Sequence, residues 1–533
     1  MILKPHRKLK KTLLFVAVCL FLSSCSWFRT KPEIAVVLSK HFDNKLYNDF
    51  DTVAYDSVFV KKMDELSSKL SNPKVIKAYY AHHQDRPLLV TRFYVNGALD
   101  TLKSYIQRSK ADGFNPEIFR VNELETLLQT LDANQFKKIN EVYPLVADLE
   151  IKAADALLKY STFIKYGSVN PKKLFNRYYI ANKRPDSLKL DSMLNTTDLV
   201  AVLKDAQQTS KNYLDLKKAL ALYRDSLGTD ENPAIKAIKL NMERMRWQLP
   251  VKTEETVLVN IPDFSLTWFK GQDTLTHMNV CVGGKREEGY ADKMKAYLKS
   301  KNLDDKPKNH ETPQLVSVFN AIQVNPVWNI PVSIAQSEIY WQAVRDPYYL
   351  SNNNIKVYLK GKLVNDPDTI QWNKYSREKL PFQFKQGSGE GNALGKFKFI
   401  FDNSSSIYLH DTNNKNGFRL ANRAISHGCV RIEKPLEFAQ LMVRDKYQYD
   451  QLRMEVNLPP VDTTRMKQYQ KKLAKRTDTL NAFQLKPSWF ATRKNVAVVI
   501  GYFTAWAENG KVQFRPDVYD YDETLWEAIK KYM

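Results

Sequence analysis

The sequence predicts an α+β protein, with a mainly helical N-terminal scaffold domain over residues 26–250 and a β-rich domain over residues 251–533. Two observations support this division. Before residue 250 apolar residues recur every three or four positions, the period of an amphipathic helix. After it they alternate with polar residues, the period of a strand. A chain of 533 residues is long enough for two or more domains, each with a core of its own.

The first 25 residues have the pattern of an export signal. Basic residues between His6 and Lys11 precede an apolar run, Leu13 to Leu22, that is shorter than the roughly 20 residues needed to span a bilayer. The run ends in Leu22-Ser23-Ser24-Cys25, which resembles a bacterial lipobox. We expect residues 1–25 to be a lipoprotein signal peptide and Cys25 to carry lipid. Ser26, Trp27 and Phe28 follow Cys25 without an acidic retention signal, so we expect an outer-membrane lipid anchor facing the periplasm; the alternative is an uncleaved membrane anchor.

The composition suits an anionic partner without naming one. The formal net charge of +23 favours contact with nucleic acid, anionic lipid head groups or the carboxylates of a cell wall. Export argues against nucleic acid. The sequence has no zinc-finger spacing, no P-loop and no dinucleotide-binding glycine pattern.

Three apolar stripes define helices of the N-terminal domain. They run through Leu99 to Ile106, through Leu145 to Tyr160, and through Ile235 to Met245. The third begins after Asn232-Pro233, a pair that suits a helix start because asparagine caps free N–H groups and proline fits the first turn. We interpret all three stripes as core faces of a helical scaffold.

Alternating segments define the strands of the C-terminal domain. A first hairpin is predicted from Val257 to Trp268 with a further strand from Leu275 to Val282, and a last hairpin from Val496 to Phe514. Between them we expect strands at 315–324, 355–359, 397–401 and 407–410. A charged insertion at about 283–312 interrupts the pattern, with a short helix from Asp292 to Leu303. We interpret it as a solvated excursion rather than a lid.

The cysteines raise a choice between a disulfide and a reactive thiol. Cys19 lies in the signal peptide and Cys25 in the lipobox, which leaves Cys281 and Cys429. These two could form a disulfide in an oxidising compartment. The alternative, which the surrounding motif favours, is that Cys429 is free because it reacts.

The motif is Ser426-His427-Gly428-Cys429-Val430-Arg431, with Tyr408 and His410 a short way upstream. In extended segments side chains alternate between faces, so Cys429 shares a face with Arg431, and Tyr408 shares one with His410. Gly428 permits the turn that presents the thiol. Pro435 is expected to start a helix just beyond the motif.

These residue types suit acyl transfer. A thiolate is the nucleophile, a histidine can take its proton and return it to a leaving amine, and backbone N–H groups around Gly428 and Cys429 can stabilise an oxyanion. Arg431 can hold a substrate carboxylate with its planar fork or pair with Glu433 or Asp411. A zinc site at Cys429, His410 and His427 is the other reading, but no suitable fourth ligand stands out.

These residues resemble the L,D-transpeptidase family, whose catalytic domain carries a histidine followed by a Ser/Thr-His/Ser-Gly-Cys-x-Arg/Asn motif. The 19 positions between His410 and Cys429 fit the large YcbB-like branch. Further segments are similar to that branch: Val259 to Pro262, Asn325 to Pro331, Leu380 to Phe384, Leu394 to Phe397 and Tyr519 to Asp522.

The resemblance implies a YkuD-type catalytic domain over residues 251–533 that forms 3→3 cross-links between peptidoglycan stem peptides. Cys429 forms the acyl-enzyme and D-alanine leaves; His410 is the base. Gly428, His427 and Ser426 shape the oxyanion region, while Arg431, Tyr408 and Trp328 bind substrate, although Trp328 could equally be a core aromatic. No cofactor and no metal are implied, and carbapenems are expected to acylate Cys429.

Two alternatives stay open at this point. The same thiol could serve an L,D-carboxypeptidase or a hydrolase of cross-links or lipoprotein links, and the fold could belong to a non-catalytic wall-binding lipoprotein. The segment from about 165 to 245 looks too short for the peptidoglycan-binding module of YcbB-like relatives. Substrate capture is therefore assigned to the scaffold, to the basic charge or to a partner among the cell-wall enzymes.

Overall fold

The computed structural model describes residues 31–228, 231–251, 253–477 and 485–533. The expected signal peptide and the lipidation site at Cys25 lie outside these residues. The chain forms two compact units: one contains residues up to 165 together with 184–208 and Tyr532, and the other contains 166–183, 209–531 and Met533. No helix within the described residues is long and apolar enough to cross a membrane.

Helix gives way to strand close to residue 250, between α13 (Pro233–Arg246) and β1 (Glu255–Asn260). The compact units divide earlier in the chain. α13 and α12 (Lys211–Leu227) belong to the strand-containing unit, because Met242 and its neighbours pack with Ala507 in one hydrophobic cluster.

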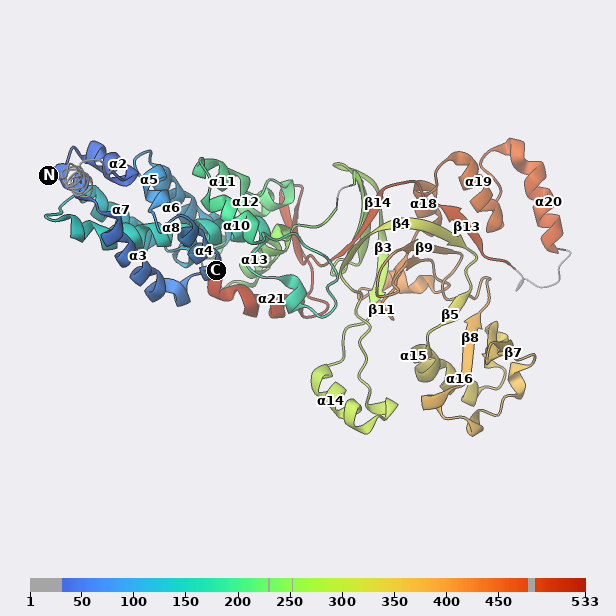
Figure 1. Cartoon of the computed structure of the whole chain (residues 1–533). Helices are drawn as coiled ribbons and strands as arrows, with labels where there is room; N and C mark the ends of the chain where they lie inside the picture. Colours follow the sequence, from blue (N-terminus) through green and yellow to red (C-terminus); the bar gives the residue numbers. More distant parts are fainter. Residues whose placement is uncertain (1–30, 229–230, 252, 478–484) are drawn as a thin grey trace, which may run out of the picture. The chain divides into compact units, whose positions relative to one another are not determined.

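The first unit is helical and is built around one long helix, α8 (Val142–Tyr166). Most of the side chains of α8 are buried, as expected for a helix that neighbours surround on all sides (Figure 1). Its Glu150 accepts hydrogen bonds from the N–H groups of Leu89 and Val90 and from Tyr80, so this buried carboxylate satisfies free donors at a helix start. The other helices of the unit are α2 (Glu33–Phe42), α3 (Thr52–Leu66), α4 (Pro73–His82), α5 (Leu88–Phe93), α6 (Ala98–Arg108), α7 (Val121–Ala133), α10 (Ser187–Leu194) and α11 (Leu199–Asp205).

The second unit is built on a ten-stranded mixed sheet with the order β11-β3-β12-β10-β9-β4-β14-β1-β2, in which β13 also pairs with β4. β2 pairs with β3, so the sheet closes on itself and leaves few free edges. The buried residues Val257, Leu266 and Trp268 alternate with more exposed neighbours along the first strands, as the sequence pattern predicts. Its strands are β1 (Glu255–Asn260), β2 (Ser265–Lys270), β3 (Asp273–Gly283), β4 (Leu315–Val324), β9 (Phe397–Phe401), β10 (Leu409–His410), β11 (Ala424–Ser426), β12 (Val430–Ile432), β13 (Ser488–Ala491) and β14 (Val496–Gly501).

The prediction of a last hairpin beginning at Val496 was wrong in its first half. β14 (Val496–Gly501) enters the closed sheet, parallel to β1 and antiparallel to β4. Only β15 (Ala505–Glu508) and β16 (Lys511–Phe514) form the hairpin. The residues of β14 are buried throughout, as expected of a strand covered on both faces, and the local pattern did not separate that run from the next strand.

The helices of the second unit cover and extend the sheet. The expected helix at Pro435 is present as α18, whose Phe438 packs against Trp268, Phe319 and Phe399. The helices beyond α12 and α13 are α9 (Pro171–Leu174), α14 (Tyr290–Ser300), α15 (Val332–Ile334), α16 (Tyr340–Arg345), α17 (Tyr349–Asn352), α18 (Pro435–Met442), α19 (Lys446–Glu455), α20 (Met466–Thr477) and α21 (Tyr521–Ile529).

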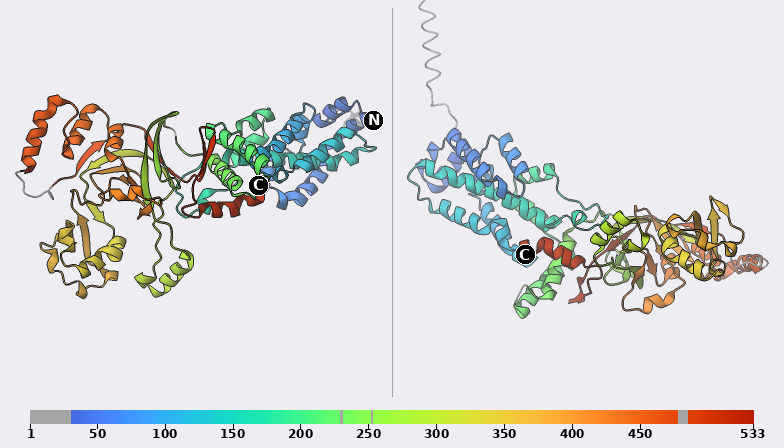
Figure 2. Two further views of the ribbon diagram at one scale, coloured as in Figure 1. Left: turned by 180° about the vertical axis from the view of Figure 1, so that it is seen from behind. Right: turned by 90° about the horizontal axis from the view of Figure 1, so that it is seen from below.

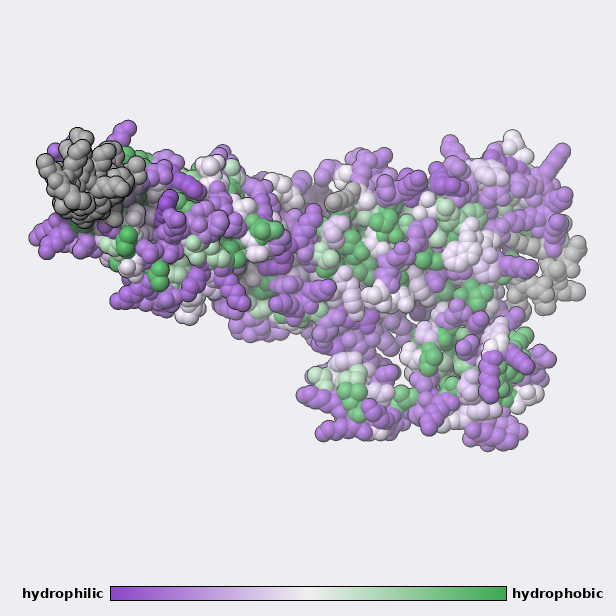
Figure 3. Space-filling model, viewed as in Figure 1, coloured by the Kyte–Doolittle hydropathy of each residue, from purple (hydrophilic) through white to green (hydrophobic). Residues whose placement is uncertain are grey.

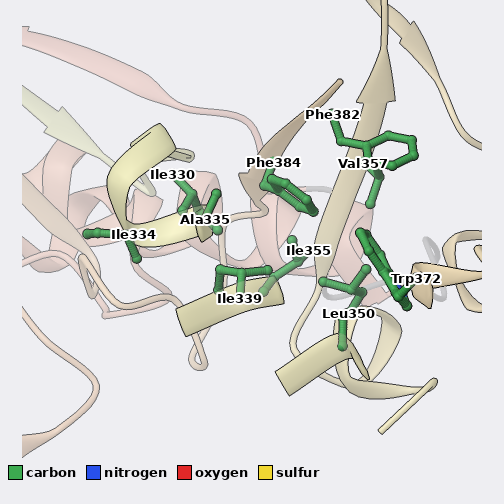
Figure 4. Close-up of a cluster of buried hydrophobic side chains, with 11 residues drawn as sticks. Ile330, Ile334, Ala335, Ile339, Leu350, Ile355, Val357, Trp372, Phe382 and Phe384 are labelled. Carbon is green, nitrogen blue, oxygen red and sulfur yellow. The ribbon is translucent and has the colours of Figure 1, made fainter. Parts of the chain in front are cut away.

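A small-sheet subdomain, residues 328–386, leaves the main sheet between β4 and β9. Its strands are β5 (Trp328–Ile330), β6 (Ile355–Leu359), β7 (Lys362–Leu363) and β8 (Phe382–Gln386), in the order β5-β8-β6-β7. Helices α15 to α17 and a π-helical turn, Ala335–Ile339, pack on it around Trp372 and Phe384 (Figure 4). In two opposite views it projects from the closed sheet (Figures 1 and 2).

The insertion at 283–312, hereafter the arm, contains α14 (Tyr290–Ser300), which begins and ends slightly before the predicted helix. No residue of α14 is buried, and hydrophilic residues cover much of the visible face of the molecule, the arm included (Figure 3). The returning end of the arm is different: Glu311 and Thr312 are buried. The arm is therefore a solvated excursion only at its tip.

Candidate active site

Two neighbouring strands carry the residues of the motif on one face. β10 runs parallel to β12, with Leu409 opposite Val430 and His410 opposite Arg431. Leu409 and Val430 are fully buried in the core, so alternation turns His410 and Arg431 to the other face. Tyr408 and Cys429 each lie two positions earlier in their segments and turn the same way. The structure thus brings together residues that lie about two dozen positions apart in the chain.

A short loop presents Cys429 at the start of β12. The Ser426 hydroxyl accepts a hydrogen bond from the Gly428 N–H at 3.1 Å and donates to the Cys429 carbonyl at 2.6 Å. Gly428 has a φ of 120°, a backbone conformation that side chains disfavour. A Cβ at this position would also lie 3.5 Å from the carbonyl oxygen of His310.

The end of the arm braces the same loop. The Thr312 hydroxyl donates to the Gly428 carbonyl at 2.8 Å and accepts from the Gly283 N–H at 2.8 Å. A Cβ on Gly283 would lie only 1.7 Å from His310 O, so glycine is required where the arm returns to β3. These contacts fix the nucleophile loop from the side opposite to Ser426.

Tyr408 lies beside the sulfur of Cys429, and both its backbone and its side chain lower the pKa of the thiol. Lys398 lies 3.9 Å above the Tyr408 ring and, with Arg431, lowers the pKa of the thiol. Burial acts more strongly, and the pKa of Cys429 is raised overall. The resting thiol is therefore protonated and needs a base, while Tyr408 favours the thiolate.

His410 is oriented to act as that base. Its side chain is 5% exposed, and Nδ1 contacts the carbonyl oxygen of Asp411. A carbonyl only accepts, so Nδ1 carries the proton and Nε2 is left as the acceptor. Burial, and next the charge of Arg431, lower the pKa of His410 to about 3. The imidazole is thus neutral at physiological pH and can receive a proton during attack.

Arg431 makes no ion pair among the described residues, and its buried Nε has no hydrogen-bond partner there. The two structural alternatives do not apply to it: Asp411 pairs with Lys415, and Glu433 accepts from the Asn279 N–H. Burial lowers the pKa of the guanidinium. A partly buried cation without an anion can receive a carboxylate.

The oxyanion prediction is corrected in one respect. The Gly428 N–H is occupied by Ser426, so of the two N–H groups expected to face an oxyanion only that of Cys429 lacks a protein acceptor among the described residues. Ser426 shapes the loop by taking this donor rather than by facing a substrate.

His427 contacts residues of two other segments. Its Nε2 lies 2.6 Å from Oε1 of Glu338, in the π-helical turn of the small-sheet subdomain. Its ring also stacks on His310 of the arm, with centroids 4.5 Å apart. Glu338, His310, Thr312 and Lys398 were not predicted as site residues, because single charged or polar residues carry no pattern and only the fold brings them to Cys429.

Trp328 packs against the hydrophobic cluster of the small-sheet subdomain. No ring contact among the described residues joins it to Tyr408 or His410. The structure thus shows it partly buried against a core, and the prediction that it binds substrate stays untested.

The two described cysteines, Cys281 and Cys429, are both free. No group of three or more His, Cys, Asp or Glu side chains in the described part of the chain could hold a metal ion.

Comparisons with known proteins agree with the division of the chain. The L,D-transpeptidase catalytic domain, YkuD, matches residues 254–457, and the Scaffold domain matches residues 74–220. A Haemophilus influenzae protein named "Putative L,D-transpeptidase" is 27% identical over 301 residues, which are 55% of this chain and 51% of that protein. The chain thus spans about half the length of this curated relative. The chain thus carries a YkuD L,D-transpeptidase catalytic domain together with a Scaffold domain.

Proposed function

We propose that the protein is a peptidoglycan L,D-transpeptidase that forms 3→3 cross-links through an acyl-enzyme on Cys429 and releases D-alanine. The observation that carries the proposal is the arrangement around one sulfur: the backbone and the side chain of Tyr408 both lower the pKa of the Cys429 thiol, and His410 offers an acceptor nitrogen on the same face. A cysteine with a purely structural role would need neither the stabilisation by Tyr408 nor a neighbouring base.

Acylation follows from these positions. His410 Nε2 takes the thiol proton as the sulfur attacks the carbonyl carbon of the third residue of a stem peptide. The Cys429 N–H is placed to donate to the resulting oxyanion, a donor whose loss typically costs about 3 kcal/mol in the barrier. As the tetrahedral adduct collapses, the C–N bond breaks, and His410 returns the proton to the departing amine of D-alanine.

The second half reaction consumes the thioester. An amine on the side chain of another stem attacks it, the new amide forms, and the proton of the amine returns through His410 to the sulfur. Arg431 supports substrate binding as a cation without a protein partner that can hold a substrate carboxylate. If water attacks instead, the same residues perform the hydrolysis of an L,D-carboxypeptidase.

We extend the proposal to the envelope. A lipid anchor at Cys25, a periplasmic position at the outer membrane and peptidoglycan as substrate belong together, since a wall enzyme must face the wall. Lipidation predicts that protein from cells partitions into the detergent phase, and that the Cys25→Ala variant does not.

The test of function is product analysis. Purified protein is incubated with disaccharide tetrapeptides from peptidoglycan, and the products are separated by mass. Cross-linked dimers with release of D-alanine support transpeptidation. Shortened monomers alone support the carboxypeptidase, and unchanged substrate supports a wall-binding protein and rejects the enzyme.

A further inference from the structure

The small-sheet subdomain places one carboxylate beside the nucleophile loop. Ala335 and Ile339 of the π-helical turn, and Ile334 just before it, are buried in the hydrophobic cluster (Figure 4). Glu338, in the same turn, has a side chain that is 49% exposed. π-helical turns are rare and often lie at functional sites, because the extra residue redirects a side chain.

Glu338 contacts the loop directly. Its Oε1 lies 2.6 Å from Nε2 of His427, whose side chain is 36% exposed, and His427 is two residues from Cys429. Oε2 of Glu338 has no hydrogen-bond partner among the described residues. The carboxylate is thus held by one oxygen and offers the other to solvent.

The surroundings of Glu338 are otherwise basic. His427, His310 and Lys308 lower the pKa of this carboxyl group. The charge of Glu338 in turn favours a higher pKa for Arg431. An ionised, half-exposed carboxylate beside the nucleophile, with one oxygen free of protein partners among the described residues, can pair with an ammonium group through that oxygen.

Resting on the proposed function, we infer that Glu338, held by His427, is the specificity-determining residue that receives the ammonium group of the amine acceptor. Donor and acceptor then meet different charges: Arg431 takes a carboxylate, and Glu338 takes a cation. The opposite charges of Arg431 and Glu338 would then distinguish the donor stem peptide from the acceptor stem peptide.

The proton balance fits this position. The acceptor arrives as an ammonium ion and passes one proton to the Glu338–His427 pair, from which it reaches solvent, because both side chains are partly exposed. The freed lone pair attacks the thioester carbon. A second N–H proton passes to His410 Nε2 and then to the Cys429 sulfur as the C–S bond breaks.

The test uses competition for one acyl-enzyme. Full-length protein is given a tetrapeptide donor together with either a second tetrapeptide, whose side-chain amine is cationic, or hydroxylamine, which is uncharged at neutral pH. The ratio of transfer to hydrolysis is measured for each nucleophile. This ratio does not depend on how fast the acyl-enzyme forms.

For Glu338→Gln we expect the ratio for the cationic acceptor to fall about tenfold, with a raised KM for that acceptor, and the ratio for hydroxylamine to stay at the wild-type value. Glu338→Asp should restore part of the loss. The matched control is Glu378→Gln, which removes the same charge from the same subdomain and breaks an ion pair with Arg377 away from the loop.

Every outcome of this competition experiment either supports or overturns the inference. Equal losses for both nucleophiles would show a role in shaping the loop and overturn the inference, as would an unchanged ratio in Glu338→Gln or an equal fall in Glu378→Gln. A wild-type protein that forms no acyl-enzyme overturns the proposed function itself. One that forms it but transfers to no amine overturns transpeptidation and this inference, and leaves hydrolysis.

Discussion

Two thiols of the same unit lie within the influence of Arg431: Cys281 on β3 and Cys429 in the loop before β12. Cys281 on β3 is directly opposite Arg431 and is 1% exposed, while Cys429 precedes β12 and is only partly buried. Burial raises the pKa of each, and Arg431 opposes it in each. Only the pKa of Cys429 is also lowered by the backbone and the side chain of Tyr408. The comparison teaches that a nearby cation does not by itself make a reactive cysteine; access and further groups that favour the thiolate do.

The largest expected difference between the thiols is covalent labelling. A carbapenem should add once to the wild-type protein and once to Cys281→Ala, and not at all to Cys429→Ala, because only one sulfur is reachable and activated. Intact-protein mass spectrometry measures this. An adduct on Cys281 in the folded protein would reverse the assignment of the two thiols.

Removing the base should have the next largest effect. His410→Ala is expected to lower the rate of D-alanine release by about 100- to 10,000-fold, because the protonated thiol then has no acceptor. Binding of the variant to peptidoglycan serves as the control. Rates within tenfold of wild type would mean that another group takes the proton.

The same histidine predicts an acid dependence of stability. The unfolded chain binds a proton at His410 below about pH 6.5, whereas the pKa in the fold is about 3. The unfolded state therefore holds more protons in this window, and stability falls as the pH drops from about 6.5 towards 3. His410→Gln should flatten this part of the curve of unfolding free energy against pH, measured by urea titration.

A smaller effect is expected at Tyr408. Its hydroxyl lowers the pKa of Cys429, so Tyr408→Phe should move the pH profile of alkylation by iodoacetamide to higher pH. Loss of one hydrogen bond to a charged group corresponds to about tenfold less thiolate at a fixed pH. Tyr358→Phe, in the small-sheet subdomain, is the matched control. An unshifted profile would mean that only the Tyr408 N–H supports the sulfur.

The smallest effect is expected at the second thiol. Cys281→Ala should lower the unfolding free energy by about 1 kcal/mol, as is usual for a buried substitution, and leave D-alanine release near wild type. In the wild-type protein Cys281 should be alkylated only after denaturation. A loss of activity as large as that of Tyr408→Phe would show that Cys281 positions Arg431.

Much of this protein follows from local patterns. Helical periodicity located α6, α8 and α13, and alternation located the strands that include Leu409 and Val430, because burial of one face repeats with the period of the element. The spacing of His410 and Cys429 pointed to the family, and strand alternation placed their side chains on one usable face. The division between helix and strand near residue 250 came from the same change of period.

The tertiary structure determined features that the hydrophobic periodicity of the sequence does not encode. The run after Val496 was split between two sheets, since its pairing with β1 joins segments more than two hundred residues apart. Glu338, Thr312 and Lys398 reached the site from separate segments, and the Gly428 N–H went to Ser426 instead of an oxyanion. The sequence by itself determined which residues can react, because residue types set the chemistry and strand alternation sets the face on which each side chain lies. The fold decided which charges surround these residues, because that depends on contacts between distant segments.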